Sequence, residues 1–300
     1  MENDADEGPA LVRQLFARSG RAFLVGITGS PGAGKSTLVD GLVSHWRKVG
    51  RTVGVLAVDP TSPFSGGAML GDRVRMQAHA QDADVFIRSM ATRGHLGGLA
   101  RATTDAALVL DAAGKDLIAI ETVGVGQDEV EIARTADVSV LVLVPGMGDE
   151  VQALKAGVME IADVFVVNKA DRDGADRAVA EVESLLTLHV YAQGEWRPAI
   201  LRTEATTGHG IDDLVATIDQ FRTHSATIAS RRRERAASQL RAILGARLLR
   251  QIESRVSVMQ MGKLVDRIVA RTLDPYSAVD EVLSEDEPQA ARSGVKGPRD

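Results

Sequence analysis

The sequence predicts an α/β fold with a mostly parallel central sheet flanked by helices, followed by a C-terminal helical extension. Short apolar runs alternate with helical patterns from Phe23 to about Gln220. Most of these runs lack polar alternation, as expected of strands that are covered on both faces. Helical segments of suitable length separate them and provide the crossovers that parallel strands require. After Phe221 the strand-like runs stop.

Seven strands are expected in the first part of the chain. They lie at residues 23–28, 52–58, 84–89, 116–121, 138–144, 163–168 and 198–203. Beyond them, residues 231–256 have the pattern of a helix with one apolar stripe, and two shorter helices are expected at residues 262–271 and 274–283. The stripe consists of Leu240, Ile243, Leu244, Leu248, Ile252 and Val256.

These elements predict four segments along the chain. Residues 1–20 would form a short helical arm, residues 21–224 the α/β domain, residues 225–283 the helical extension and residues 284–300 a tail. The tail is polar and is therefore expected to be disordered. The apolar stripe of the extension would either join two copies of the chain or pack back on the parent domain.

The composition restricts the classes of function. The net charge of −6 argues against a nucleic-acid partner, and the lack of cysteine excludes disulfides, thiolate metal sites and a cysteine nucleophile. The N-terminus is not that of a signal peptide, and no apolar run approaches the roughly 20 residues of a membrane span. A cytoplasmic protein is therefore expected. The six histidines form no H-x-x-x-H pair and are expected at the surface or in loops.

A glycine-rich motif, G-x-x-x-x-G-K-[ST], occurs at Gly29, Gly34, Lys35 and Ser36. It follows an expected strand and opens an expected helix, and this context separates a phosphate-binding loop from an ordinary glycine-rich turn. Backbone N–H groups and the helix N-terminus would hold phosphate oxygens. Lys35 should reach the β- and γ-phosphates, and Ser36 should ligate Mg²⁺. The expected nucleotide-binding positions here are Ser30, Pro31, Gly32, Ala33, Gly34, Lys35, Ser36 and Thr37.

A second motif, N-K-x-D at Asn168, Lys169 and Asp171, ends a later strand and is typical of guanine recognition. The Asp171 carboxylate can accept from guanine N1–H and the 2-amino group. Adenine offers neither donor and would leave a carboxylate unpaired, which disfavours ATP. Lys169 can lie along the base plane, and Asn168 is expected to brace the loop. "TEATTGHG" loosely fits a further guanine motif, with Glu204 where serine is usual and the Ala205 amide near guanine O6.

Three acids are candidates for the metal and the reaction. Asp59 ends an expected strand and is placed to hold Mg²⁺ or its waters, unless it forms an Asx turn before Pro60. Asp72 lies in the glycine-rich segment beyond and would approach the γ-phosphate, although it could equally cap a helix. Glu121 would complete the outer shell of the metal. The expected catalytic residues are therefore Lys35, Asp72 and Glu121.

The stretch "ETVGVGQ" departs from the D-x-x-G pattern that nucleotide hydrolases usually keep. Its acid is Glu121, its first glycine is Gly124, and the nearest glutamine, Gln127, does not directly follow that glycine. Taken alone, the stretch would be either a damaged switch or an intact switch of another kind.

From about Arg21 to Leu283 the chain resembles the MeaB/ArgK family of P-loop GTPases, which belongs to the SIMIBI class. The resemblance rests on the segments at residues 26–42, 57–76, 86–103, 121–132, 145–171 and 273–278. In that family Glu121 is the expected acid of E-T-V-G, so the resemblance implies an intact switch. Switches of this class commonly act in dimers or with a protein partner.

The resemblance also implies a function. The chain would be a GTP-hydrolysing chaperone of an adenosylcobalamin-dependent acyl-CoA mutase, with GTP/GDP and Mg²⁺ as its cofactors. It would gate cofactor loading, protect the mutase and form a homodimer through its C-terminal helices. Members of the family usually carry a longer helical N-terminal arm than the roughly twenty residues that precede the first strand here.

Some positions are expected to face the partner. By the resemblance, the segment at residues 145–157 would respond to the mutase, unless it is only a strand-to-helix connection. Charge reversal at Arg93 should weaken partner binding and leave the affinity for GTP intact. The expected switch and partner positions are Arg93, His95, Gly124, Gln127, Asp149, Glu150 and Lys155.

Three other functions compete with this interpretation. A metallochaperone GTPase for a nickel enzyme would be expected to show a Cys/His cluster, and the chain has no cysteine. A transport accessory ATPase or protein kinase, the role attached to the ArgK name, requires ATP, against which N-K-x-D argues. A GTP-dependent scaffold with negligible turnover would differ only in its kinetics.

Overall fold

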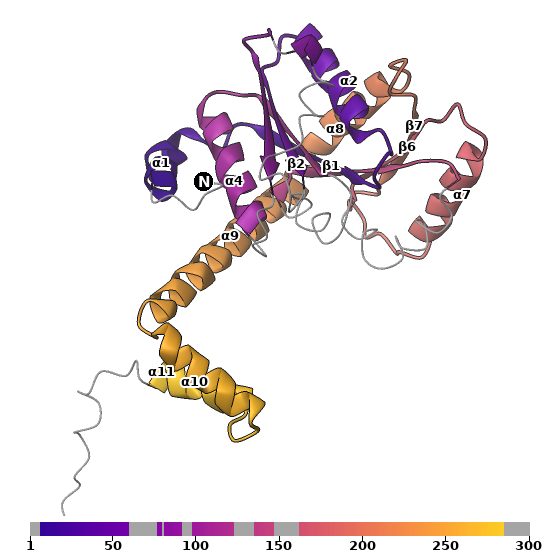
Figure 1. The fold of residues 1–300 in the computed structure, drawn as a ribbon. Coiled ribbons are helices and arrows are strands. Elements are labelled where there is room, and N and C mark those ends of the chain that lie inside the picture. The colour runs from indigo at the N-terminus through magenta and orange to yellow at the C-terminus, as the bar shows by residue number, and fades with distance from the viewer. Residues whose placement is uncertain are drawn as a thin grey trace, which may run out of the picture. The chain divides into compact units, whose positions relative to one another are not determined.

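The computed structural model describes residues 7–59, 77–79, 81–91, 98–122, 135–146 and 162–284. The chain divides into two compact units, Met1–Ser238 and Gln239–Asp300, and Figure 1 shows the elements of both. Among the described residues no helix is both long enough and apolar enough to cross a membrane.

The first unit is built on a seven-stranded sheet in the order β3-β2-β4-β1-β5-β6-β7. Every pair of neighbouring strands is parallel. The strands are β1 (Phe23–Gly29), β2 (Val53–Asp59), β3 (Val85–Ala91), β4 (Leu117–Thr122), β5 (Val138–Leu143), β6 (Val164–Asn168) and β7 (Ala199–Thr203). The predicted fold class and all seven predicted strands are confirmed.

Helices cover both faces of this sheet (Figure 1). Apolar side chains of α2 and α8 pack on one face, and those of α4 and α7 pack on the other. All residues of β1, β4, β5 and β6 are buried in consequence, which explains their apolar runs without alternation. The described helices of the first unit are α1 (Glu7–Leu15), η1 (Phe16–Arg18), α2 (Lys35–Lys48), η2 (Gln77–His79), α4 (Gly98–Ala112), α7 (Ala175–Leu186) and α8 (Ile211–Arg222). Helix α9 (Ser225–Glu253) begins in this unit and continues into the second.

The phosphate loop lies at the point where the order of the strands reverses. The chain moves from β1 outward to β2 and β3 on one side, and β5 to β7 extend the sheet on the other. Ligands of open parallel sheets bind at such a point, outside the carboxyl ends of the strands. The loop between β1 and α2 lies there, between the ends of β4 and β5.

The amino ends of two strands carry a cluster of ion pairs with α9. Arg231 bonds the Asp163 carboxylate through both terminal nitrogens, each at 2.6 Å. Arg232 and Arg235 approach Asp137 at 3.1 and 3.3 Å. Burial raises the pKa of Asp163 from 3.8 to about 6, although Arg231 acts in the opposite direction. The first turns of α9 are therefore fixed to the starts of β5 and β6.

One histidine lies neither at the surface nor in an irregular loop, the two places expected for the histidines. His79, at the end of η2, is only 9% exposed. Its Nε2 lies 3.3 Å from Asp40 Oδ1 and 3.3 Å from Ser44 Oγ, both on α2. The polar face of α2 holds this imidazole, and no local pattern in the sequence marks that tertiary contact.

The second unit contains the rest of α9, then α10 (Val258–Val269) and α11 (Pro275–Ser284). Helix α9 begins at Ser225, the first residue of the expected helical extension, and includes most of the predicted helical stretch. The predicted start of the next helix was wrong, because α10 begins at Val258 and not at residue 262. The start of α10 has a physical cause in a capping box, in which Ser257 and Gln260 exchange side-chain and backbone hydrogen bonds. The S-x-x-Q spacing was a readable signal for it.

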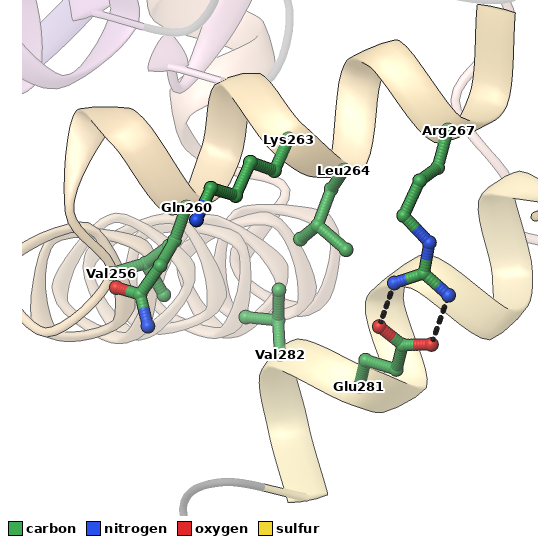
Figure 2. A pocket seen from close by; sticks show the side chains of 7 residues that line it. All are labelled: Val256, Gln260, Lys263, Leu264, Arg267, Glu281 and Val282. Carbon is green, nitrogen blue, oxygen red and sulfur yellow. Dashed lines mark hydrogen bonds and ion pairs between the residues drawn. The ribbon is translucent and has the colours of Figure 1, made fainter. Parts of the chain in front are cut away.

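A small pocket lies within this unit, between α10 and α11 (Figure 2). Arg267 and Glu281 close one end with two hydrogen bonds of 2.6 and 3.0 Å, and Leu264 and Val282 supply apolar lining. Its volume of about 170 Å³ is below the roughly 300–1,000 Å³ of typical ligand sites. The pocket is therefore too small to be a second nucleotide site.

Candidate nucleotide site

Two glycines allow the phosphate loop to adopt its shape. Gly29 has φ +136°, and a side chain there would collide with the carbonyl oxygen of Val142 in β5. Gly34 has φ +88° and lies directly before α2; its side chain would collide with Nδ2 of Asn168. Only glycine combines such backbone angles with such close neighbours.

Lys35 lies in the first turn of α2 and is 5% exposed. Its Nζ donates to the carbonyl oxygens of Gly29 at 2.5 Å and Ser30 at 2.8 Å. A buried ammonium group needs such acceptors, because its desolvation is otherwise costly. The carbonyl oxygens of the first two loop residues therefore hold the ammonium group against the loop.

Ser36 and Glu121 come together beside the loop. The Ser36 hydroxyl donates to Glu121 Oε1 at 2.6 Å, and the two residues are 8% and 6% exposed. Their positions follow from the sheet, because Glu121 in β4 pairs with Ile27 in β1, two residues before the loop begins. The sequence assigned both residues to the metal, and the structure places them in contact.

These oxygens suit Mg²⁺, which prefers hard oxygen ligands and takes few of them from the protein. Phosphates and water usually supply the remainder. The described residues contain no cluster of three or more His, Asp or Glu that could hold a metal ion. Asp59 ends β2 at the same edge of the sheet, where Ala57 pairs with Glu121.

Asn168 connects three parts of the site. Its Nδ2 donates to the carbonyl oxygen of Ala33 in the phosphate loop at 2.8 Å. Its Oδ1 accepts from the Thr203 hydroxyl at 3.0 Å and from the Ala205 amide at 3.1 Å. The side chain is 2% exposed, so Asn168 links the phosphate loop to the segment after β7.

The remaining residues of the guanine motifs lie around this link. Lys169 has a left-handed φ of 57°, and its Nζ donates to the carbonyl oxygen of Gly32 at 2.8 Å. Asp171 is exposed in the turn after β6, where its carboxylate is accessible to a ligand. The Glu204 amide bonds the His209 carbonyl at 3.0 Å. The Ala205 amide, expected near guanine O6, donates to Asn168 here.

Several predicted site residues lie outside the described part of the chain. They are Asp72, Arg93, His95, Gly124, Gln127, Asp149, Glu150 and Lys155.

Sequence reasoning missed two features of the sheet, one next to the site and one at the opposite, amino ends of the strands. Thr28 and Thr122 join β1 to β4 through a buried hydroxyl–hydroxyl bond of 3.0 Å, for which the sequence carries no signal. The second feature is the pair of acids that form ion pairs with α9. Asp137 and Asp163 each stand in the same Ala-Asp-Val sequence before a strand, and this repetition was a usable signal.

Comparisons with known proteins identify the family of the chain. The family model described as methylmalonyl Co-A mutase-associated GTPase MeaB matches residues 2–257. A Pyrococcus abyssi protein named as a GTPase is 49% identical over 290 residues, 95% of this chain and 90% of that protein. The mitochondrial methylmalonic aciduria type A homolog of Mus musculus is 37% identical over 268 residues, 87% of this chain and 65% of that protein. The crystal structure of a LAO/AO transport system kinase has a TM-score of 0.70 at 27% identity, with 93% of this chain and 86% of that chain covered.

The family match spans the phosphate loop, Glu121 and the N-K-x-D motif together. Guanine-nucleotide binding follows from the family. The chain therefore belongs to the MeaB family and is a P-loop GTPase.

Proposed function

We propose that this GTPase is a chaperone of an adenosylcobalamin-dependent acyl-CoA mutase, with methylmalonyl-CoA mutase as the first candidate. It would use GTP to gate cofactor loading and to protect the mutase. The observation that supports this most is the family match over residues 2–257, because the description of that family names the mutase. The name of the mouse relative, which refers to methylmalonic aciduria, points the same way.

In this proposal the phosphate loop binds the triphosphate of GTP. The loop amides and the N-terminus of α2 face the phosphate oxygens. Lys35 would exchange at least one of its carbonyl acceptors, on Gly29 or Ser30, for a β- or γ-phosphate oxygen. Its charge would then stabilise the charge that develops as the bond to the γ-phosphate breaks.

Guanine would bind beside the N-K-x-D motif and the segment after β7. Asp171 would accept from the base, and the Lys169 stem would lie along its plane while Nζ remains near Gly32. Both acceptor positions of Asn168 and one of its two N–H donors are taken by protein partners, so its role would be to hold the loops. The Ala205 amide would turn from Asn168 to guanine O6, with Glu204 as its neighbour.

Ser36, Glu121 and Asp59 would hold Mg²⁺ or its waters. Mg²⁺, when bound, would neutralise charge on the β–γ bridge and the γ-phosphate. The Ser36 hydroxyl has one hydrogen, which points to Glu121, so its lone pairs face away from that carboxylate. Asp72 stays our candidate for orienting the attacking water, together with the segment after Glu121.

A homodimer through the C-terminal helices is part of the proposal. On α9 the stripe residues Leu240, Leu244 and Leu248 are 67%, 54% and 50% exposed. Apolar side chains exposed in a row at helical spacing favour a covered interface. Sedimentation of the chain with Leu244→Glu and Leu248→Glu should give a monomer where the unchanged chain gives a dimer; a monomer in both cases contradicts the dimer.

Complex formation tests the chaperone role. The chain, loaded with GDP or with a non-hydrolysable GTP analogue, is mixed with a purified adenosylcobalamin-dependent mutase and passed over a sizing column. A complex that depends on the bound nucleotide supports the proposal. Coelution in neither state, with nucleotide retained on the chain, contradicts it for that mutase.

A nucleotide-driven transport accessory kinase is the second candidate, because a solved structure that resembles this chain is named LAO/AO transport system kinase. This function would require ATP. Competition of ATP and GTP for the site separates the two candidates, and a clear preference for ATP would favour the kinase.

A further inference from the structure

Two neighbouring residues of β4 hold the two ends of the phosphate loop. Glu121 accepts from Ser36, at the loop's end, at 2.6 Å. Thr122 donates through its hydroxyl to the Thr28 hydroxyl at 3.0 Å, and Thr28 directly precedes Gly29, where the loop begins. Both threonines are 2% exposed.

The two contacts lie on opposite faces of the sheet. The backbone pairing of β1 with β4 is followed as far as Ile27 and Glu121, and the hydroxyl bond joins the next residue of each strand. Because successive side chains of a strand alternate between faces, Thr28 and Thr122 lie on the face opposite Glu121. Thr122 therefore acts on the loop and on Glu121 through the backbone.

We infer that Thr122 is a positioning residue for the Mg²⁺–nucleotide site. Its hydroxyl fixes the end of β4 against the start of the loop, so that the Glu121 carboxylate meets Ser36 in the orientation that leaves the serine lone pairs to the metal. The inference rests on the proposed metal role of Ser36 and Glu121. It does not involve the mutase.

Thr122→Val tests this with almost no change of shape. Mutation of a residue that orients a metal ligand typically lowers metal affinity or activity by roughly 10–100-fold. We expect the Mg²⁺ concentration that half-maximally tightens binding of methylanthraniloyl-GDP to rise by roughly tenfold. The affinity for the same nucleotide in excess EDTA should stay unchanged. Thr122→Ser keeps the hydroxyl and should restore the Mg²⁺ dependence of the unchanged chain.

Thr103→Val is a matched control. Thr103 lies in α4 and is 3% exposed, and its hydroxyl bonds to no residue that the structure describes. Removing that hydroxyl tests the general effect of a buried Thr→Val change. It should leave the Mg²⁺ dependence in place.

Thr28→Val removes the acceptor and gives an independent route to the same result. It should produce the same shift, and the double variant should shift no further than either single one, because one bond is lost in all three. A folded Thr122→Val or Thr28→Val chain with the original Mg²⁺ dependence overturns the inference. A Thr122→Ser chain whose Mg²⁺ dependence shifts as far as that of Thr122→Val also overturns it. If Thr122→Val does not fold, the Thr28→Val and Thr122→Ser chains still test the inference.

All of these measurements use the chain alone with nucleotide and Mg²⁺. A negative result leaves the chaperone proposal untouched, and failure to bind the mutase leaves this inference untouched.

Discussion

At the scale of single residues, Lys35 is the cation that we propose acts on the phosphates. Lys35→Ala removes that charge and should lower kcat by roughly 10²–10³-fold, the cost typical of losing one group that stabilises transition-state charge. Steady-state GTP hydrolysis measures the loss, and circular dichroism confirms the fold. Unchanged turnover in a folded Lys35→Ala chain would contradict the assignment.

Asp171 is the residue from which selectivity for guanine is expected. Asp171→Asn replaces an acceptor-only carboxylate with an amide that also donates, and should reduce the preference for GTP over ATP by at least roughly a hundredfold. Competition binding with both nucleotides measures this. Asp173, exposed in the same turn, supplies the control: Asp173→Asn should keep the preference. Equal selectivity in both variants would remove Asp171 from base recognition.

At the scale of elements, the contact between α9 and the sheet depends on a buried ion pair. Arg231→Met leaves the Asp163 carboxylate, 6% exposed, without its partner. Breaking such a pair typically costs roughly 3–5 kcal/mol of unfolding free energy. Urea denaturation at neutral pH measures the loss, with Arg233→Met, an exposed arginine of the same helix, as the control. Equal stability of the two variants would show that the pair contributes little.

The same carboxyl makes stability depend on pH. Burial raises the pKa of Asp163 from 3.8 to about 6 against the influence of Arg231. Because the folded state holds this proton more tightly, the group's contribution is full below pH 3.8 and is lost as the pH rises through about 6. The unfolding free energy of the unchanged chain, minus that of Asp163→Asn, should therefore fall between these pH values. A constant difference across this window would contradict the raised pKa.

The elements also show what the sequence could predict. Strands β1, β4, β5 and β6 were predictable because all of their residues are buried, which makes each run largely apolar. The start of α10 was harder to predict, because Ser257 caps this helix through a side-chain hydrogen bond that apolar periodicity does not reveal. The Thr28–Thr122 bond could not be predicted, since it depends on the register of β1 against β4.

At the scale of the whole molecule, the two motifs predicted a site that the fold assembles. Ser36 of α2, Glu121 of β4 and Asn168 of β6 come from distant parts of the chain and meet because the parallel strands end at one edge of the sheet. What the motifs could not predict is how they are joined, since Asn168 links the phosphate loop to the segment after β7 only in three dimensions. The partner's identity is a property of surfaces, for which sequence patterns give no comparable code.

The central claim is that nucleotide turnover at this site responds to a mutase. The most direct test is the rate of GTP hydrolysis by the chain, with and without a purified adenosylcobalamin-dependent acyl-CoA mutase. We predict an acceleration that saturates as the mutase concentration rises and that is lost in Lys35→Ala. A rate that stays constant at every mutase concentration, while GTP remains tightly bound, would contradict the claim.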